Sequence, residues 1–167
     1  GKSSITKTGA SANYYNVKWE PATSTLTINN IYSPKFNTGD RWNTVSFIGL
    51  TQGDLNIKLE GTTTIGDHKN TNRFYTIYAT NSSSTITISG PGKLVAKGGD
   101  ETVYYSGTPI IISGNLILTD DATVESEFAN FAIGSRESVI VRGNLTIKDR
   151  AVLKAYRTEG EYSGPVN

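Results

Sequence analysis

The chain of 167 residues contains no cysteine and no methionine, and its one histidine is His68. Without cysteine the protein forms no disulfide, has no thiolate nucleophile and binds no zinc through sulfur. A single histidine is also too few for a metal site or an acid–base mechanism that needs several imidazoles. Together these absences exclude several of the enzyme classes that a sequence reveals most directly.

The sequence also lacks an excess of charge of one sign and any long apolar run. Its 16 basic and 15 acidic side chains give a formal net charge of +1, whereas nucleic-acid-binding domains carry clustered Lys and Arg. No apolar stretch approaches the roughly 20 residues that a membrane-spanning helix needs. We therefore expect neither a nucleic-acid partner nor a membrane span in this fragment.

The absence of methionine leaves the chain without a start residue of its own. We interpret Gly1 as a scar of tag removal and residues 1–13 as a flexible N-terminal segment. Residues 14–167 are expected to form one folded domain, as a fragment of a longer protein, with further coils or domains of the same protein among its partners. The abundance of Ser, Thr, Asn and Gly, together with the missing cysteine, favours an extracellular or surface-exposed bacterial protein.

An alternating apolar pair, written L-x-I, recurs along the chain at intervals of 29, 31, 30 and 29 residues. The five copies are Leu26/Ile28, Leu55/Ile57, Ile86/Ile88, Leu116/Leu118 and Leu145/Ile147. A constant spacing of this kind marks a repeat architecture. Alternation with a period of two residues, in segments rich in Thr, Ile and Val, indicates strands.

Each repeat holds two further apolar segments. The second segments are Thr64-Ile65, Leu94-Val95, Thr123-Val124 and Val152-Leu153, and the third are anchored at Phe47, Ile77, Tyr105 and Ile133. Three strands per repeat predict an all-β fold: a single right-handed parallel β-helix, or solenoid, of about five coils of about 30 residues. An antiparallel sandwich or barrel is the weaker alternative, because two-residue hairpin loops are scarce between the repeats.

Two strand-like runs within residues 14–31 flank a turn at Glu20-Pro21-Ala22 and predict an N-terminal hairpin cap. We expect Tyr15, Val17 and Trp19 in this hairpin to cover the first coil, because an open coil exposes strand edges. The C-terminal end shows no comparable cap.

Three stretches of the chain resemble a known family. They are Trp19 with residues 23–30, residues 53–61, and residues 143–148. They are similar to β-helical repeat domains of surface proteins from anaerobic bacteria, commonly labelled carbohydrate-binding domain-containing proteins. The resemblance spans about residues 14–164 and implies a secreted, non-catalytic module that contacts polysaccharide or a host surface. It carries over no individual site residue.

Adjacent carboxylates at Asp120 and Asp121 follow the fourth L-x-I pair, and Asp149 and Arg150 take the same places one repeat later. Asp120 and Asp149 could lie one coil apart and serve a retaining glycosidase or bind calcium. The simpler interpretation is that Asp is a favoured turn residue. This chain resembles pectin-degrading β-helical hydrolases in the adjacent Asp pair alone, since it lacks their Gly-His-Gly and Arg-x-Lys motifs. We therefore predict turn residues, no metal site, no cofactor and no catalysis, and we interpret His68 as a solvated loop residue.

Aromatic residues in the third segments form the candidate binding surface. If Phe47, Ile77 and Tyr105 point inward, alternation places four other rings outward on adjacent coils: Trp42, Phe74, Tyr78 and Tyr104. Such rings suit the apolar faces of sugars, with Asn43, Arg73 and Asp100 beside them to bond hydroxyl groups. The alternative is that loops fold over these rings and bury them.

The sequence thus favours a non-catalytic carbohydrate-binding or adhesive module whose partner is a polysaccharide or cell-surface glycan. The second hypothesis is a structural stalk or spacer without a ligand. A polysaccharide lyase or hydrolase acting on acidic glycans is the third.

Overall fold

The computed structural model describes residues 15–34, 45–67, 74–98, 108–130 and 137–159. These residues form fifteen strands in three sheets and one short 3-10 helix, η1 (Pro21–Thr23). The first sheet runs β1 (Val17–Glu20), β2 (Thr25–Asn29), β5 (Leu55–Glu60), β8 (Thr85–Ser89), β11 (Asn115–Leu118) and β14 (Leu145–Ile147). The second runs β3 (Tyr32–Ser33), β6 (Thr62–Ile65), β9 (Lys93–Lys97), β12 (Thr123–Asn130) and β15 (Val152–Glu159). The third runs β4 (Val45–Leu50), β7 (Phe74–Ala79), β10 (Ile110–Ile112) and β13 (Val139–Val141).

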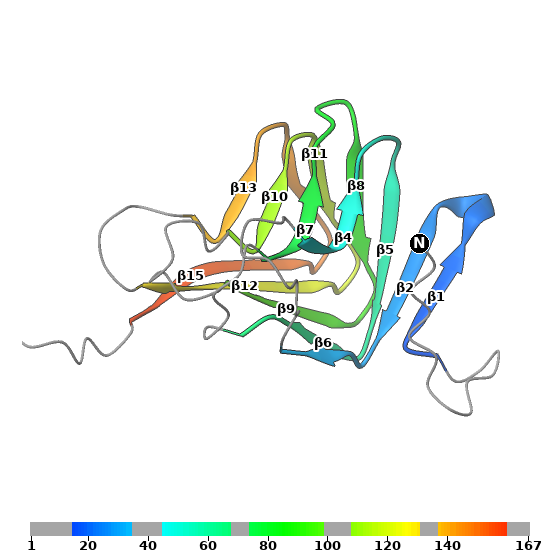
Figure 1. Ribbon diagram of the computed structural model, residues 1–167. Helices are drawn as coiled ribbons and strands as arrows, with labels where there is room; N and C mark the ends of the chain where they lie inside the picture. The colour runs from blue at the N-terminus through cyan, green and yellow to red at the C-terminus, as the bar shows by residue number, and fades with distance from the viewer. Residues whose placement is uncertain (1–14, 35–44, 68–73, 99–107, 131–136, 160–167) are drawn as a thin grey trace, which may run out of the picture.

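From β2 onward the chain visits the three sheets in turn, and strands at equivalent positions of successive coils pair in parallel (Figure 1). This arrangement confirms the parallel β-solenoid. Complete coils with three strands of at least three residues number about three: β5–β7, β8–β10 and β11–β13. The number is smaller than the expected five because β3 has only two residues and the described part of the last coil ends with β15.

The predicted L-x-I ladder runs along the inner face of the first sheet. Leu55, Ile86, Leu116 and Leu145 stand opposite one another in successive strands, and Ile57, Ile88, Leu118 and Ile147 form a second row. The first pair is displaced by two residues, since Leu26 faces Ile57 and Ile28 faces Leu59. Most of these side chains are buried, but Leu145 and Ile147 are each 47% exposed because no further coil covers them among the described residues.

All four predicted second segments lie in strands of the second sheet, but Leu94 stands opposite Thr63 and Val124, each one residue away from its expected partners Thr64 and Thr123. Thr63, Leu94, Val124 and Leu153 stand opposite one another in β6, β9, β12 and β15. The first three are buried and Leu153 packs against the same core. Apolar rows from two sheets therefore meet inside the coil and form its core.

The third sheet corrects the sequence prediction. Ile77 stands opposite Ile48 on one side and Ile110 on the other, and Ile110 stands opposite Val139. The third strands of the later coils are therefore Ile110–Ile112 and Val139–Val141, whereas the sequence pattern placed them at Tyr105 and Ile133. Both of those residues lie outside the described part of the chain.

The N-terminal hairpin forms as predicted but does not cover the core. β1 pairs antiparallel with β2, with Val17 opposite Ile28 and Trp19 opposite Leu26. These two side chains therefore share the inward face of the first sheet, yet Val17 is 39% and Trp19 51% exposed. Tyr15 instead donates its hydroxyl to Glu60 Oε2 at 3.1 Å. The expected cap thus extends the sheet edge without closing the end of the coil.

The Leu116→Ala substitution should lower the free energy of unfolding by about 2–5 kcal/mol, because the surrounding coils cannot collapse onto the cavity. Leu116 is 1% exposed. Its matched control is Leu145→Ala, which removes the same atoms from the half-exposed end of the ladder and should cost about 1 kcal/mol. Urea denaturation of both variants measures the difference, and equal losses would contradict the stacked core.

Candidate functional site

The four predicted aromatic site residues have different outcomes. Trp42 and Tyr104 lie outside the described residues, and so do Asn43, Arg73, Asp100 and His68. Phe74 is only 3% exposed and belongs to the hydrophobic core, so its predicted outward orientation is wrong. Tyr78 is half-buried on β7, which agrees with its predicted outward position.

The orientation of Phe74 follows from an irregularity in β7. The N–H groups of Thr76 and Ile77 both donate to the carbonyl oxygen of Pro109, at 2.7 and 3.2 Å. Two successive donors on one acceptor are typical of a bulge, which interrupts the alternation of side chains. Phe74 and Ile77, three residues apart, are consequently both buried.

The same irregularity brings two tyrosines to the outer surface. The rings of Tyr75 and Tyr78 stack with centroids 4.7 Å apart and an interplanar angle of 19°. Both residues are half-buried. Strict alternation from an inward Ile77 would point Tyr75 inward as well. Sequence reasoning therefore missed Tyr75, because the acceptor that disturbs the alternation, Pro109, lies one coil away.

The stacked pair continues into an apolar row across the third sheet. Ile111 stands opposite Tyr78, and Ile140 stands opposite Ile111 one coil later. Both isoleucines are half-buried. We call Tyr75, Tyr78, Ile111 and Ile140 the tyrosine row. Its aromatic and aliphatic side chains offer a surface on which the apolar face of a ligand could pack.

The paired carboxylates occupy the corner between the first and second sheets. Asp120 and Asp149 both adopt left-handed backbone conformations with φ of 58°. Gly61 and Gly90 take this conformation at the same corner of earlier coils. Asp and Gly are among the residues that adopt it most readily. The prediction that Asp120 is a turn residue is therefore confirmed.

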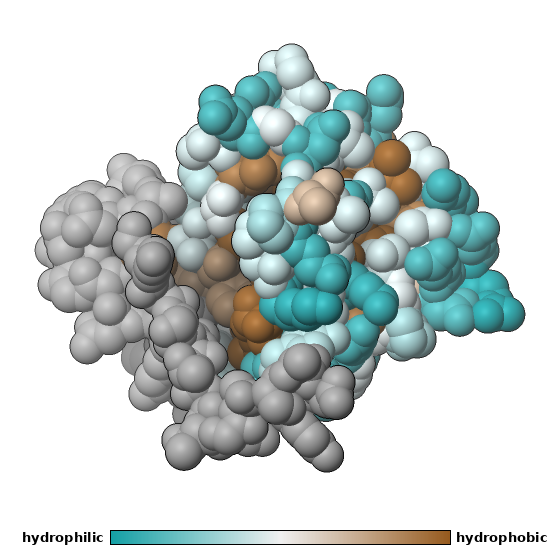
Figure 2. Space-filling view, turned by 90° about the vertical axis from the view of Figure 1, so that its right-hand side faces the viewer, coloured by the Kyte–Doolittle hydropathy of each residue, from teal (hydrophilic) through white to brown (hydrophobic). Residues whose placement is uncertain are grey.

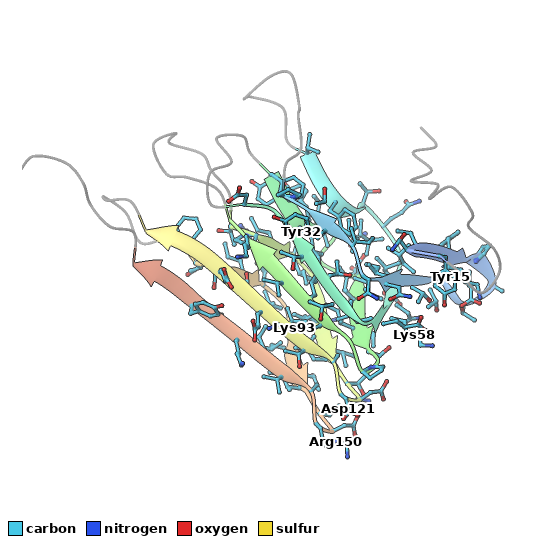
Figure 3. The ribbon with its side chains drawn as sticks, turned by 90° about the horizontal axis from the view of Figure 1, so that it is seen from below. Tyr15, Tyr32, Lys58, Lys93, Asp121 and Arg150 are labelled. Atoms are coloured by element: carbon cyan, nitrogen blue, oxygen red, sulfur yellow. The ribbon has the colours of Figure 1, made fainter. Side chains whose placement is uncertain are left out.

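The side chains at this corner bond from coil to coil. Asp149 Oδ2 accepts hydrogen bonds from Thr119 Oγ1 at 2.6 Å and from the Asp120 N–H at 3.2 Å. These donors lower the pKa of Asp149, the threonine hydroxyl contributing most. Arg150 donates two hydrogen bonds to Asp121, at 2.6 and 2.8 Å, and lowers the pKa of that carboxyl. Figure 3 shows Asp121 and Arg150 at neighbouring turns. The carboxylates of Asp121 and Asp149 thus both bond to neighbouring coils at the corner.

A charged cluster that the sequence analysis did not single out lies on the outer face of the second sheet. Glu125, 9% exposed, receives Lys93 Nζ at 2.6 Å on one oxygen and Lys154 Nζ at 3.0 Å on the other. The two ammonium groups, Lys93 first, lower the pKa of Glu125. Two residues further along each strand, Tyr156 donates its hydroxyl to Glu127 at 2.5 Å, which raises the pKa of Tyr156 to about 12.

We call Lys93, Glu125 and Lys154 the Lys-Glu-Lys ladder. Sequence reasoning missed it because Lys93 stands opposite Thr123, two residues before Glu125, and the predicted segments aligned Leu94 with Thr123 and not with Val124, its observed partner.

The described residues contain no group of three His, Asp or Glu side chains close enough to hold a metal ion. Within the same residues, no helix has the length and apolar character needed to cross a membrane.

No protein-family model, curated protein or solved structure matches this chain. The resemblance to carbohydrate-binding surface proteins is therefore supported at the level of the β-solenoid alone.

The Glu125 carboxylate should make stability dependent on pH. Its pKa in the folded protein lies below the ordinary value of 4.5, so its contribution is complete above that value and is lost as the pH falls through the lowered pKa. The Glu125→Gln variant should be less stable than the wild type at pH 7 and should lose less stability on acidification. Thermal unfolding between pH 7 and pH 3 measures both effects. Glu137→Gln, at an exposed loop position, is the control and should behave as the wild type does; parallel pH profiles for all three proteins would contradict the role of the ladder.

Proposed function

We propose that this chain is a non-catalytic binding module of an extracellular or cell-surface bacterial protein, and that it contacts carbohydrate through the tyrosine row. The observation that carries the proposal is the stacked Tyr75–Tyr78 pair, half-buried on the outside of the third sheet. Two aromatic rings at the surface offer π faces to the C–H groups of a sugar ring, and phenol groups offer hydrogen bonds to its hydroxyls.

The other two sheets are less suited to this role. The central outward row of the first sheet is Thr25, Asn56, Thr87, Ile117 and Thr146. The outer charges of the second sheet are largely paired with one another, as at Glu125. The second sheet has an outer row that begins with Tyr32 and ends in the charged residues Glu125 and Lys154, whereas the described outer row of the third sheet, from β7 to β13, is aromatic and aliphatic throughout. Since the net charge is only +1, binding should depend little on salt.

A structural stalk is the second candidate, and the coil-to-coil bonds favour it. Arg150 reaches Asp121, Lys154 reaches Glu125 and Tyr156 reaches Glu127, each across one coil. Such bonds resist separation of the coils along the axis. Both roles are compatible with one protein, because the bonds occupy the second sheet and its corner while the tyrosine row occupies the third. A lyase or hydrolase on acidic glycans stays the third hypothesis, with no described carboxylate pair left free for it.

Binding to a glycan array, followed by titration of the best ligand, tests the proposal. Tyr78→Ala and Tyr75→Ala should each weaken binding roughly two- to tenfold, because one ring contact is worth about 0.5–1.5 kcal/mol. Trp42→Ala and Tyr104→Ala test the two predicted positions outside the described residues in the same assay.

Tyr32→Ala is the matched control. Its ring is 75% exposed on β3, in the second sheet, and its removal should leave binding unchanged. Melting temperatures of all variants confirm that each protein is folded. A folded wild type that binds no glycan would support the stalk, and equal losses for Tyr32→Ala and Tyr78→Ala would place the ligand elsewhere.

A further inference from the structure

The outward positions of β4 and β7 lie in two close pairs on the outside of the third sheet. Ser46 stands opposite Tyr75 and Gly49 opposite Tyr78, so the outward residues of both strands are three positions apart. In β7 the two rings stack with centroids 4.7 Å apart. In β4 a Cβ added to Gly49 would lie 2.8 Å from Ser46 Oγ. A tall aromatic pair in β7 therefore stands beside a low pair, Ser46 and Gly49, in β4.

The position over Gly49 is open. Gly49 is exposed, and apart from Ser46 Oγ no atom beyond its chain neighbours lies within 4 Å of the place that a Cβ would take. Gly49 is not among the described residues with positive φ, so its backbone conformation does not demand glycine. Its lack of a side chain instead leaves the side of Tyr78 that faces β4 uncovered at this position.

Ser46 supplies a polar group at the edge of the open position. Its Oγ has no hydrogen-bond partner among the described residues, and a hydroxyl group both donates and accepts. The ring of Tyr78, in the neighbouring strand, offers an aromatic surface to C–H groups. A ligand that fills the space over Gly49 must therefore combine apolar groups with hydroxyl groups, which is the chemistry of a sugar ring.

The described strands of the third sheet carry no charge. β4, β7, β10 and β13 contain no Asp, Glu, Lys or Arg, whereas β5, β9, β12 and β15 each contain at least one of them. Glu137 and Arg142 flank β13, at the opposite edge of the sheet from β4. The end of the solenoid on which β1 and β2 lie is likewise rich in hydrophilic groups, as Figure 2 shows. A carboxylate or phosphate on a ligand would lose water against these strands without meeting a cation from them, which costs free energy.

We propose that the tyrosine row selects neutral glycans, and that Ser46 and Gly49 complete its binding site. One sugar ring occupies the space over Gly49 with its C–H groups against Tyr78, and a hydroxyl group of that ring bonds to Ser46 Oγ. This site rests on the proposed carbohydrate-binding function, to which it adds the class of ligand and two residues that determine specificity. An acidic glycan binds weakly for lack of a cation, and any side chain at position 49 competes with the sugar.

Isothermal titration calorimetry with matched hexasaccharides tests the class of ligand. The neutral probes are hexamers of the cellulose, mannan and galactan type, and the acidic probes are the same three chains built from the corresponding uronic acids. At least one neutral probe should bind. Its acidic counterpart should bind at least about tenfold more weakly, because its carboxylates lose hydration without a cationic partner. Equal or tighter binding of the acidic counterpart would contradict the neutral class.

Two variants in β4 test the residues of the site. Ser46→Ala should weaken binding of the neutral probe about two- to tenfold, as expected for one lost hydrogen bond. Ser46→Ala/Gly49→Val removes the hydroxyl that a Cβ at position 49 would meet and fills the space over it, so binding should fall at least about tenfold below that of Ser46→Ala. Ser89→Ala removes a half-buried hydroxyl from the outer face of the first sheet. It is the control and should bind as the wild type does.

Melting temperatures establish that each variant is folded. If the double variant does not fold, Ser46→Ala and the acidic probes decide the question. Binding that Tyr78→Ala weakens but the β4 variants leave unchanged would overturn this site while the proposed function stands. A folded wild type that binds glycans on the array but none of the neutral probes would also overturn this site alone. One that binds no glycan at all would remove the proposed function as well.

Discussion

The register between successive coils is the constraint on which the rest of this structure depends. Each strand pairs in parallel with the strand 29 to 33 residues further on, so side chains at equivalent positions of the repeat stand directly above one another. Apolar positions thereby become the inner ladders of the core. Polar positions become the outer rows, where Glu125 forms ion pairs with both Lys93 and Lys154. The corners obey the same rule, since the left-handed residues Gly90, Asp120 and Asp149 each follow the first residue of their L-x-I pair by the same number of positions.

The sequence was sufficient to predict two of the three sheets. In the first sheet every coil carries an L-x-I pair, and a one-residue slip would turn all of them outward. A two-residue slip keeps them inward, and the structure contains one such displacement, between β2 and β5. The second sheet follows because its strands begin after a short corner of nearly constant length. The third sheet was assigned wrongly in the later coils because a strand there can begin at different distances from the second sheet. The conspicuous aromatic segment around Tyr105 was chosen over the short run Ile110–Ile112, which directly precedes the next first-sheet strand.

The candidate site was predictable only in part for a related reason. Simple alternation placed Tyr78 outward, as observed, but it also placed Phe74 outward and Tyr75 inward. The bulge at Thr76 and Ile77 depends on the Pro109 carbonyl, which belongs to the following coil. The sequence around β7 contains no pattern that would predict this contact with Pro109. The sequence therefore predicted the correct sheet for the candidate surface. It named Phe74 where the structure has Tyr75, which stacks on Tyr78.

The three faces of the solenoid differ in chemistry, and this division organises the functional proposals: a polar first sheet, a charge-paired second sheet, and a third sheet with an aromatic and aliphatic row. The tyrosine row exists only if β10 lies between β7 and β13, so the register of these three strands is the central claim.

This register can be measured with introduced cysteines, because the chain has no cysteine of its own. The double variant Tyr78→Cys/Ile111→Cys places two cysteines on adjacent strands about 5 Å apart, a distance that a disulfide can span. The double variant Tyr78→Cys/Ile140→Cys places them two strands apart, about 10 Å, which is too far for a disulfide. Oxidation followed by mass spectrometry should find an intramolecular disulfide in the first double variant and free thiols in the second. Free thiols in the first, or a disulfide in the second, would contradict the register and with it the tyrosine row.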